Sequence, residues 1–403
     1  MRIKRTVAMA LSAALVCMLC VGAWPKRAHA ASHVYILGKL VNAALPYYTN
    51  GPGGAEGILH DTSYTGAWNA RFDAPTNTLY LNGFLARNTI VHATIGGVDY
   101  YYAVHSDGPL KIVVSGTGNE LTAMPGRGGE GSCGLLVEGD LEISGSGTLT
   151  TTGSATVDFD SYGLWCAGGG LTVGGGCTVI AQGGNASGTA TASIGAAVTS
   201  GALAVSGGSH LTGTAQAARE SIGVGYAATL TVSDASSVEG RGGAADTSVG
   251  IQDRFSRAGA VQVSDSARLT GIAGSAVVVT GVEANGGCTV SGGTFIADAS
   301  AGTNTRLAVI NALDAAGYAN YRWRTSKADA YTESGVAAYV YDRAHAYVEI
   351  VPGSTVPVVD VASAAVPKTG DGTPLMLLVG LALFSGAGLA LRASARRRRA
   401  RSR

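Results

Sequence analysis

The stretch Gly139-Asp140-Leu141-Glu142-Ile143-Ser144-Gly145-Ser146-Gly147-Thr148-Leu149 decides the fold of this chain. It consists of an alternating apolar strand, a turn of small residues and a second strand with its own apolar residue. The same unit recurs along the chain, and its copies start at Leu141, Leu171, Leu203, Leu230, Val261 and Cys288, with a looser copy at Leu110. In the six full copies the apolar residue of the second strand lies eight positions after the start, at Leu149, Val179, Leu211, Val238, Leu269 and Ile296. Successive starts are 27 to 32 residues apart, so the middle of the chain is a repeat.

Most copies are preceded by a third short strand that we expect to open with glycine, at Gly134, Gly163, Gly195, Gly223 and Gly250. Three short strands per repeat cannot fold back into one hairpin core, but stacked repeats bury equivalent Leu, Val and Ile residues in internal ladders. The pattern therefore predicts an all-β fold, a right-handed parallel β-helix (solenoid), over residues 110–300. Seven turns at roughly 4.8 Å each give a rod about 34 Å long. An antiparallel β-sandwich is the alternative, and the constant eight-residue offset favours the solenoid.

Less regular segments flank the repeat and are expected to cover its open ends as irregular β caps. Residues 31–109 form the N-terminal cap, with paired strands at Trp68–Asp73 and Asn77–Gly83. Residues 301–351 form the C-terminal cap, for which we expect a short helix at Leu307–Ala316 and strands at Tyr318–Arg324, Ala337–Tyr341 and Ala346–Val351.

The first 30 residues have the order of a secretory signal. A basic start at residues 2–5 precedes an apolar run at residues 7–24, and Ala28-His29-Ala30 has the small-x-small form of a signal-peptidase site. We expect an N-terminal signal helix that is cleaved near Ala30 or Ala31. An uncleaved membrane helix is the alternative that the small residues Ala28 and Ala30 disfavour.

The last 38 residues, 366–403, combine three elements. Val366-Pro367-Lys368-Thr369-Gly370 is followed by a 17-residue apolar run, Leu375–Leu391, and by a basic tail, residues 392–403. A helix of that length spans about 26 Å, close to one hydrocarbon core. We expect a transmembrane helix at residues 374–391 with the arginines on the cytoplasmic side, and a short linker before it at residues 352–365.

This arrangement resembles the Leu-Pro-x-Thr-Gly sorting signal of sortase substrates, with Val366 in place of leucine. The resemblance implies that a sortase cysteine attacks the carbonyl of Thr369, that Gly370 and everything after it leave, and that the acyl group passes to an amine of the peptidoglycan precursor. The chain is then a substrate, secreted and anchored in a Gram-positive cell wall, whose precursor passes through the plasma membrane. Val366 leaves the class of sortase open.

The net charge of +1 hides an acidic body. Residues 1–30 hold five basic residues and the segment after Gly370 holds seven, so residues 31–369 keep 16 basic against 26 acidic residues, a net charge near −10. That balance argues against nucleic acid as a partner. It suits a soluble surface protein.

Most of the body resembles the β-helical "carbohydrate-binding domain-containing" surface proteins of Gram-positive bacteria. The stretches that carry the resemblance are Thr78–Gly83, Gly139–Leu149 and Tyr321–Thr325. It implies glycan binding, with calcium as an optional aid, and supplies no motif for individual residues.

Aromatic residues concentrate in the flanks, and flat rings stack on sugar faces. Tyr100, Tyr101, Tyr102 and Trp323 are therefore the candidate glycan contacts, although packing of the caps explains such residues equally well. Three consecutive tyrosines in a strand alternate between its faces, so we expect at least one ring to point outward.

Four aspartates are the candidate metal or catalytic residues. Asp158 and Asp160 form the tightest acidic pair, which could bind calcium or act as acid and base, but a solvated loop between turns is the favoured interpretation. Asp234 and Asp265 occupy equivalent positions of adjacent repeats and should stack. We favour turn residues that accept local backbone N–H groups over a pair that shares a cation.

No catalytic group stands out, since none of the seven histidines lies at metal-ligand spacing from another. Cys133, Cys166, Cys177 and Cys288 are expected to be buried thiols, and the sequence leaves their disulfide state open. We expect a binding or adhesive protein without a resident cofactor rather than an enzyme. Two alternatives stay open: a β-helical polysaccharide lyase or hydrolase, and a passive surface rod. An acidic cluster with a basic residue on one solenoid face would favour the enzyme.

Overall fold

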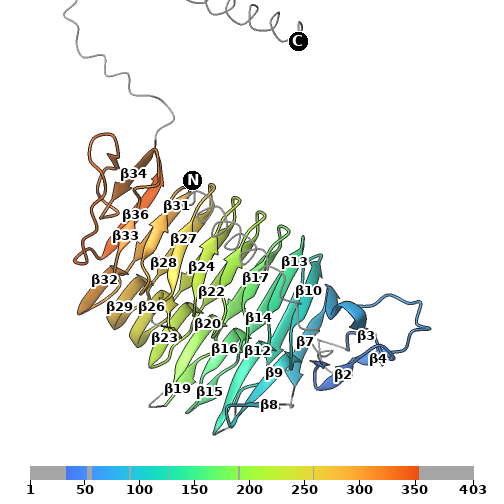
Figure 1. Ribbon diagram of the computed structural model, residues 1–403. Helices are drawn as coiled ribbons and strands as arrows, with labels where there is room; N and C mark the ends of the chain where they lie inside the picture. Colours follow the sequence, from blue (N-terminus) through green and yellow to red (C-terminus); the bar gives the residue numbers. More distant parts are fainter. Residues whose placement is uncertain are drawn as a thin grey trace, which may run out of the picture. The chain divides into compact units, whose positions relative to one another are not determined.

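The computed structural model describes residues 33–51, 57–89, 92–126, 128–188, 191–256 and 258–353. Within these ranges the regular structure is β-strand, apart from one 3₁₀ turn, η2 (Ala74–Thr76). The strands form three large sheets and one small one (Figure 1).

Sheet A contains, in spatial order, β2 (Lys39–Val41), β1 (Val34–Ile36), β9 (Val98–Ser106), β12 (Glu130–Val137), β16 (Ser161–Cys166), β20 (Ala192–Val198), β23 (Glu220–Tyr226), β26 (Ala245–Asp253), β29 (Ala276–Glu283) and β32 (Thr305–Ile310), with β8 (His92–Ile95) beside β9. Sheet B contains β33 (Leu313–Asp314), β30 (Cys288–Val290), β27 (Ala260–Val263), β24 (Thr229–Val232), β21 (Leu203–Val205), β17 (Leu171–Val173), β13 (Leu141–Gly145), β10 (Leu110–Ser115), β6 (Thr78–Asn82), β5 (Ala70–Asp73), β3 (Tyr47–Thr49) and β4 (Ile58–His60). Sheet C contains β35 (Thr332–Glu333), β34 (Tyr321–Arg324), β36 (Tyr347–Pro352), β31 (Thr294–Asp298), β28 (Arg268–Ile272), β25 (Ser237–Arg241), β22 (His210–Thr214), β18 (Thr178–Gln182), β14 (Thr148–Thr152), β11 (Asn119–Ala123) and β7 (Leu85–Thr89). Sheet D pairs β15 (Thr156–Val157) with β19 (Ala186–Ser187).

The chain visits sheets A, B and C in rotation, and each strand pairs in parallel with the equivalent strand one turn later. This arrangement confirms the parallel β-helix and rejects the β-sandwich. The parallel ladder of sheet A runs over eight strands, from β9 to β32. Parallel pairing in sheet B already begins at β6, which pairs with β10, so the solenoid starts inside residues 31–109.

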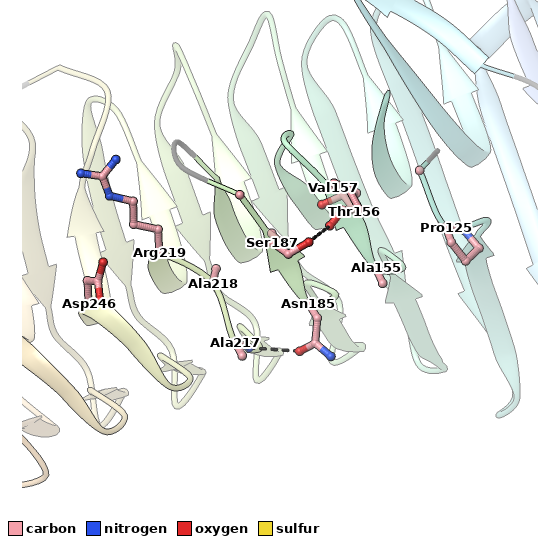
Figure 2. A pocket seen from close by; sticks show the side chains of 13 residues that line it. Pro125, Ala155, Thr156, Val157, Asn185, Ser187, Ala217, Ala218, Arg219 and Asp246 are labelled. Carbon is pink, nitrogen blue, oxygen red and sulfur yellow. Dashed lines mark hydrogen bonds between the residues drawn. The ribbon is translucent and has the colours of Figure 1, made fainter. Parts of the chain in front are cut away.

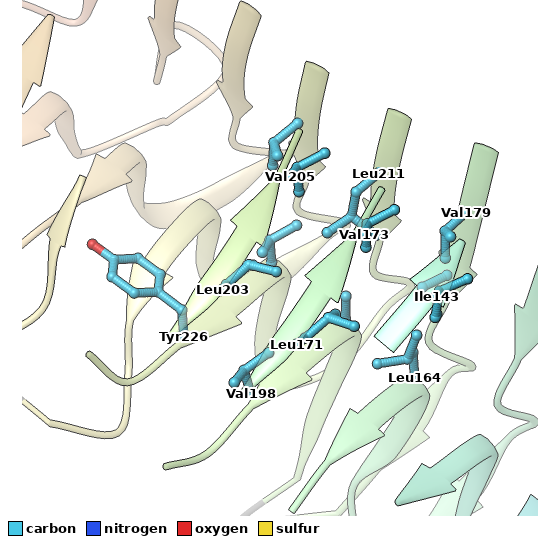
Figure 3. Packing of buried hydrophobic residues seen from close by; sticks show 14 of the residues in the cluster. Ile143, Leu164, Leu171, Val173, Val179, Val198, Leu203, Val205, Leu211 and Tyr226 are labelled. Atoms are coloured by element: carbon cyan, nitrogen blue, oxygen red, sulfur yellow. The ribbon is translucent and has the colours of Figure 1, made fainter. Parts of the chain in front are cut away.

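The core consists of inward-facing columns of aliphatic side chains that stack from turn to turn (Figure 3). In sheet B, Leu141 pairs with Leu171, Leu171 with Leu203 and Leu203 with Leu230, and none of the four is more than 1% exposed. Full burial of one leucine stabilises by about 1.5–3 kcal/mol, so the columns are the main source of stability.

The predicted eight-residue offset holds for five of the six full copies. In the last copy, Leu269 of β28 pairs with Phe295, which is fully buried, and Ile296 instead faces outward. The turn before β31 is one residue shorter than its counterparts and contains Gly293 in the left-handed region, with φ of 77°. The prediction for Ile296 is therefore wrong by one residue.

A column of glycines lies inside the strands of sheet A, at Gly134, Gly163, Gly195, Gly223, Gly250 and Gly281. The prediction that these glycines stand at the start of their strands is wrong, since β12 begins before Gly134 and β23 begins before Gly223. A Cβ on Gly223 would lie 2.1 Å from the backbone nitrogen of Arg241 and 2.6 Å from the carbonyl oxygen of Gly250. These positions have no room for a side chain because sheet C comes within contact distance there.

The caps agree with the sequence in part. β5 and β6 form the expected antiparallel pair, and β34 and β36 are the expected strands near the C-terminal end. The predicted helix at Leu307–Ala316 is wrong: β32 and β33 occupy this segment, because the open edges of β29 and β30 offer a full set of backbone partners. Residues 337–341 are not a strand: the backbone there is irregular and follows a turn at residues 334–336.

Among the described residues, Cys133, Cys166, Cys177 and Cys288 are separate, buried thiols, as expected, and none forms a disulfide. Burial raises the pKa of the Cys166 and Cys288 thiols to about 12 and also raises the pKa values of Cys133 and Cys177. All four thiols are therefore protonated and unreactive at neutral pH.

Candidate functional site

A long groove follows the corner at which sheet C turns into sheet A. It has a volume of about 1030 Å³ and crosses five successive turns, from Pro125 to Asp246 (Figure 2). We call this cavity the corner groove. It is lined by Pro125, Gly126, Ala155, Thr156, Val157, Asn185, Ala186, Ser187, Gly188, Ala217, Ala218, Arg219 and Asp246.

The backbone of the corner groove bonds to itself from turn to turn. Examples are the amide of Thr156 with the carbonyl of Asn185 (2.9 Å) and the amide of Ala186 with the carbonyl of Ala217 (2.9 Å). A ligand in the groove would therefore form its polar contacts with side chains rather than with the backbone. Asn185 and Ser187 are exposed, and Val157 presents an apolar surface that is 47% exposed. The lining is uncharged and consists mainly of small apolar residues with a few polar side chains, except at one end, where it contains an arginine and an aspartate.

The outer face of sheet A carries a second group of candidate side chains. Trp165 of β16 pairs across the turns with Ala197, Gly225, Gln252 and finally Glu283 of β29, so these residues form one row. Small residues therefore separate an aromatic end of the row from a polar end. The ring of Phe255 lies over Gly225, where a Cβ would be 3.3 Å from it.

The aromatic end is tightly packed. The rings of Tyr162 and Trp165 stack with centroids 4.6 Å apart, and Tyr100 meets Trp165 edge-on at 5.0 Å. The indole Nε1 of Trp165 is buried without a hydrogen-bond partner. Burial, followed by the negative charge of Asp160, raises the pKa of Tyr162 well above its ordinary value, so its hydroxyl stays protonated and donates to Asp160 (2.9 Å).

The polar end surrounds a pocket of about 490 Å³, which we call the sheet A pocket. It is lined by Glu220, Gln252, Asp253, Arg254, Phe255, Glu283 and Asn285. Arg254 forms an ion pair with Glu220. Burial raises the pKa of Glu283, and the neighbouring Asp253 and Glu220 carboxylates raise it further, against hydrogen bonds from the side chains of Gln252 and Asn285.

Comparison of the chain with protein-family models, with curated proteins and with solved structures finds no match.

The three tyrosines predicted as glycan contacts are all buried. Tyr100, Tyr101 and Tyr102 are 6%, 8% and 3% exposed, so the expectation that at least one ring faces solvent is wrong. Tyr100 packs in the aromatic end described above, while Tyr101 and Tyr102 contact the rings of His92 and His105. The strand that carries them is covered on both faces, which alternation along the strand could not reveal.

Trp323 lies in β34 of the C-terminal cap. Its indole Nε1 donates to the carbonyl of Ala337 (3.1 Å), and its ring meets Tyr339 edge-on at 5.4 Å. The ring is half-buried and packs against the core, so it serves the cap and keeps only part of its surface for a ligand.

The candidate aspartates do not form a site together. Asp160 accepts from the amide of Ala192 (2.7 Å) in addition to Tyr162, whereas Asp158 lies at the corner with a left-handed φ of 68°. Within the described ranges, no three His, Cys, Asp or Glu side chains come close enough to hold a metal ion.

Asp234 and Asp265 stack in adjacent turns as expected, and the amide of Ala235 donates to the carbonyl of Asp265 (3.0 Å). Asp234 and Ala235 both have positive φ, of 54° and 57°, and Asp265 and Ser266 repeat this geometry. These are the tight turns between sheets B and C, in which aspartate tolerates the left-handed region. Glycine pairs occupy the same corner at 175–176 and 207–208.

The remaining predicted site residues lie outside the described residues: the signal-cleavage residues Ala28, Ala30 and Ala31, and the sorting motif Val366, Pro367, Lys368, Thr369 and Gly370. The predicted signal helix, transmembrane helix and basic tail also lie there. Among the described residues, no helix has the length and apolar character that a membrane span requires.

The sequence did not single out the sheet A pocket, although a signal for it exists. Trp165, Ala197, Gly225, Gln252 and Glu283 each stand two positions after a glycine of the sheet A column. Aligning the repeats on those glycines would have placed the row on one face.

Proposed function

We propose that this chain is a cell-wall-anchored surface protein whose solenoid binds glycans along the corner groove. The anchoring half of the proposal rests on the order of motif, apolar run and arginines at residues 366–403, which resembles a sortase signal. A sortase would join Thr369 to peptidoglycan, and the chain would display its solenoid outside the cell.

One observation supports the glycan half: the corner groove is elongated along the solenoid and open, and it crosses five turns. A linear polysaccharide needs a site of that shape. Neutral hydroxyl and amide groups such as Ser187 and Asn185 match sugar hydroxyls as donors and acceptors. The exposed surface of Val157 suits the apolar face of a sugar ring.

A glycan array tests the binding half, run with and without calcium. We expect binding to linear polysaccharides, and calcium dependence would identify the ion as an aid. Ala217→Trp should abolish binding because the indole fills the groove, whereas Thr212→Trp on the outer face of sheet C should leave it unchanged. Absence of binding under both conditions, or equal binding by both variants, would refute the proposal.

Mass spectrometry of wall digests tests the anchoring half. The expected C-terminal peptide ends at Thr369 and carries a peptidoglycan fragment. A peptide that continues past Gly370 would exclude the transpeptidation.

A second candidate, a polysaccharide lyase or hydrolase, is supported by the carboxylates and the guanidinium that line the sheet A pocket. Incubation with uronate-containing and neutral polysaccharides should then release new reducing ends or unsaturated products. Glu283→Gln should abolish that release, while Glu239→Gln on the outer face of sheet C should not. Intact polymers after prolonged incubation would exclude this candidate.

A further inference from the structure

The N-terminal end of sheet B presents a row of rings and a guanidinium on its outer face. Side chains alternate in the antiparallel strands β3, β5 and β6, and the outward ones come together across the strands. His60 of β4 pairs with Tyr47, and Tyr47 pairs with Arg71. Arg71 in turn pairs with Tyr80, and all four side chains are partly exposed. We call this row, together with the adjacent Tyr64, the cap platform.

The rings of the cap platform are held in place by their own contacts. Tyr64 stacks on His60 with centroids 3.9 Å apart and meets the ring of Tyr47 at 6.0 Å. The Tyr64 hydroxyl donates to the carbonyl of Ala67 (2.8 Å). The hydroxyl of Thr49 lies 3.1 Å from Nε2 of His60. Because these contacts position the rings without a ligand, a ligand that stacks on them has little ordering entropy to overcome.

Arg71 carries a positive charge that its surroundings do not neutralise. Its Cζ lies 4.7 Å from the centroid of the Tyr80 ring, and this cation–π contact orients the planar guanidinium. In the part of the chain that the structure describes, no carboxylate forms an ion pair with Arg71 and no group accepts a hydrogen bond from its side chain. The carboxylate two positions on, Asp73, accepts instead from the hydroxyl of Thr76. The N–H donors of Arg71 therefore stay available to a ligand.

Two hollows give a ligand room on the cap platform. One has a volume of about 330 Å³, and Tyr47, Arg71 and Asp73 contribute to its lining. The other has a volume of about 530 Å³ and includes His60 and Tyr64 in its lining. Since the rings of Tyr47 and Tyr64 are neighbours, the aromatic surface connects the two hollows. Both volumes are in the range of small-molecule sites, about 300–1,000 Å³.

We propose that the cap platform binds a sugar residue that carries a carboxylate, such as a hexuronate. The carboxylate would form a bidentate pair with the Arg71 guanidinium, whose planar fork matches it. The apolar face of the sugar ring would lie against the Tyr47 ring. Asp73 would accept from the sugar hydroxyls, because a carboxylate has acceptor sites beyond the one that Thr76 fills.

Other ligands match only part of this surface. A neutral sugar leaves the Arg71 guanidinium without an anion, and an acidic peptide has no flat apolar face to stack on the rings. The inference goes beyond binding along the corner groove and does not depend on it, because the cap platform and the corner groove have no lining residue in common.

Isothermal titration calorimetry of the full-length chain tests the proposal with trigalacturonate, its methyl ester and triglutamate. We expect trigalacturonate to bind, and the ester, which keeps the rings and loses the charges, to bind at least about tenfold more weakly. Triglutamate has the carboxylates without the rings and should also bind at least about tenfold more weakly. Equal binding of the acid and its ester, equal binding of triglutamate, or no binding of trigalacturonate would overturn the proposal.

Two variants locate the binding. Arg71→Met removes the guanidinium but keeps an extended side chain over Tyr80, and should weaken trigalacturonate binding about ten- to a hundredfold. Tyr47→Ala removes a ring and should weaken it in the same direction. Arg241→Met is the matched control and should bind normally, because this sheet C arginine is already paired with Glu239. Full binding by a folded Arg71→Met variant with an unchanged melting temperature would contradict the proposal.

The corner groove is separated from the cap platform by a further variant. Ala217→Trp, which fills the corner groove, should bind trigalacturonate as tightly as the parent chain. Loss of trigalacturonate binding in this variant, with full binding in Arg71→Met, would assign the acidic sugar to the corner groove and reject the cap platform.

Discussion

The glycine column of sheet A makes the sharpest test of how the solenoid is packed. In Gly223→Ala, the new methyl group would lie 2.1, 2.5 and 2.6 Å from three backbone atoms, of Arg241, Gly240 and Gly250. An ordinary contact needs about 3.5 Å or more. The obstacles are backbone atoms of β25 and β26, which cannot move without breaking ladder hydrogen bonds to the next turns. We therefore expect a cost at or above the upper end for overpacked cores, about 3 kcal/mol.

A matched control lies in the same solenoid. A Cβ on Gly174 would meet nothing within 4 Å, and no positive φ disfavours a side chain there. Gly174→Ala should be neutral or stabilise by up to about 1 kcal/mol, because alanine loses less chain entropy on folding.

Calorimetry and chemical denaturation measure both variants. A cost of 3 kcal/mol corresponds to a melting temperature lower by roughly 5–10 °C in a domain of this size. If Gly223→Ala melted within a degree of the parent chain, sheets A and C would not be in the close contact described here. Equal losses in both variants would show that the effect belongs to glycine replacement in general.

Three other outcomes follow from the packing. Leu203→Ala should destabilise by about 3–5 kcal/mol in a denaturant titration, because its fully buried side chain stacks between two other leucines of sheet B; a loss below 1 kcal/mol would contradict this. Acid should loosen the C-terminal cap. Burial alone would raise the pKa of Glu349, but hydrogen bonds from Tyr347, Arg324 and Tyr331 outweigh it and lower this pKa. Burial is likewise outweighed at Asp298, whose pKa is lowered by hydrogen bonds from Lys327 and Ser300. The ionised forms of these two carboxylates stabilise the fold above their ordinary pKa values of 4.5 and 3.8, and this stabilisation is lost as pH falls through the lower pKa values of the folded chain. Trp323 fluorescence should therefore stay constant down to about pH 5 and change below pH 4. Cys133, Cys166, Cys177 and Cys288 should resist alkylation in the native chain and react after denaturation, as mass spectrometry of their peptides would show; rapid labelling of any of these four in the folded chain would contradict their burial.

The repeat could be read from sequence because burial enforces its period. A strand that turns one face to a solenoid core must place an apolar residue at every second position, and stacking requires the next turn to repeat it. The columns at Leu141, Leu171 and Leu203 were therefore visible before any pairing was known. The sorting and signal segments are likewise local patterns, and their roles stay predictions.

The sequence was less informative where tertiary partners compete with local preference. Leu307–Ala316 has a composition that a helix tolerates, yet the unpaired edge of β29 draws it into a strand. Ile296 and Phe295 are equally apolar, and only the length of the preceding turn decides which one enters the core. The three tyrosines of β9 alternate as expected, but both faces of that strand are covered.

The candidate sites depend on contacts between turns. In the sheet A pocket, Glu220, Gln252 and Glu283 come from three successive turns, and Asp253 folds the loop with Arg254 and Phe255 over them. The sequence by itself determined the repeat period and the inward residues, because each follows from the burial of one strand face. Only the tertiary structure decided which outward residues meet, because that depends on the register between turns and on the loops that leave the repeat.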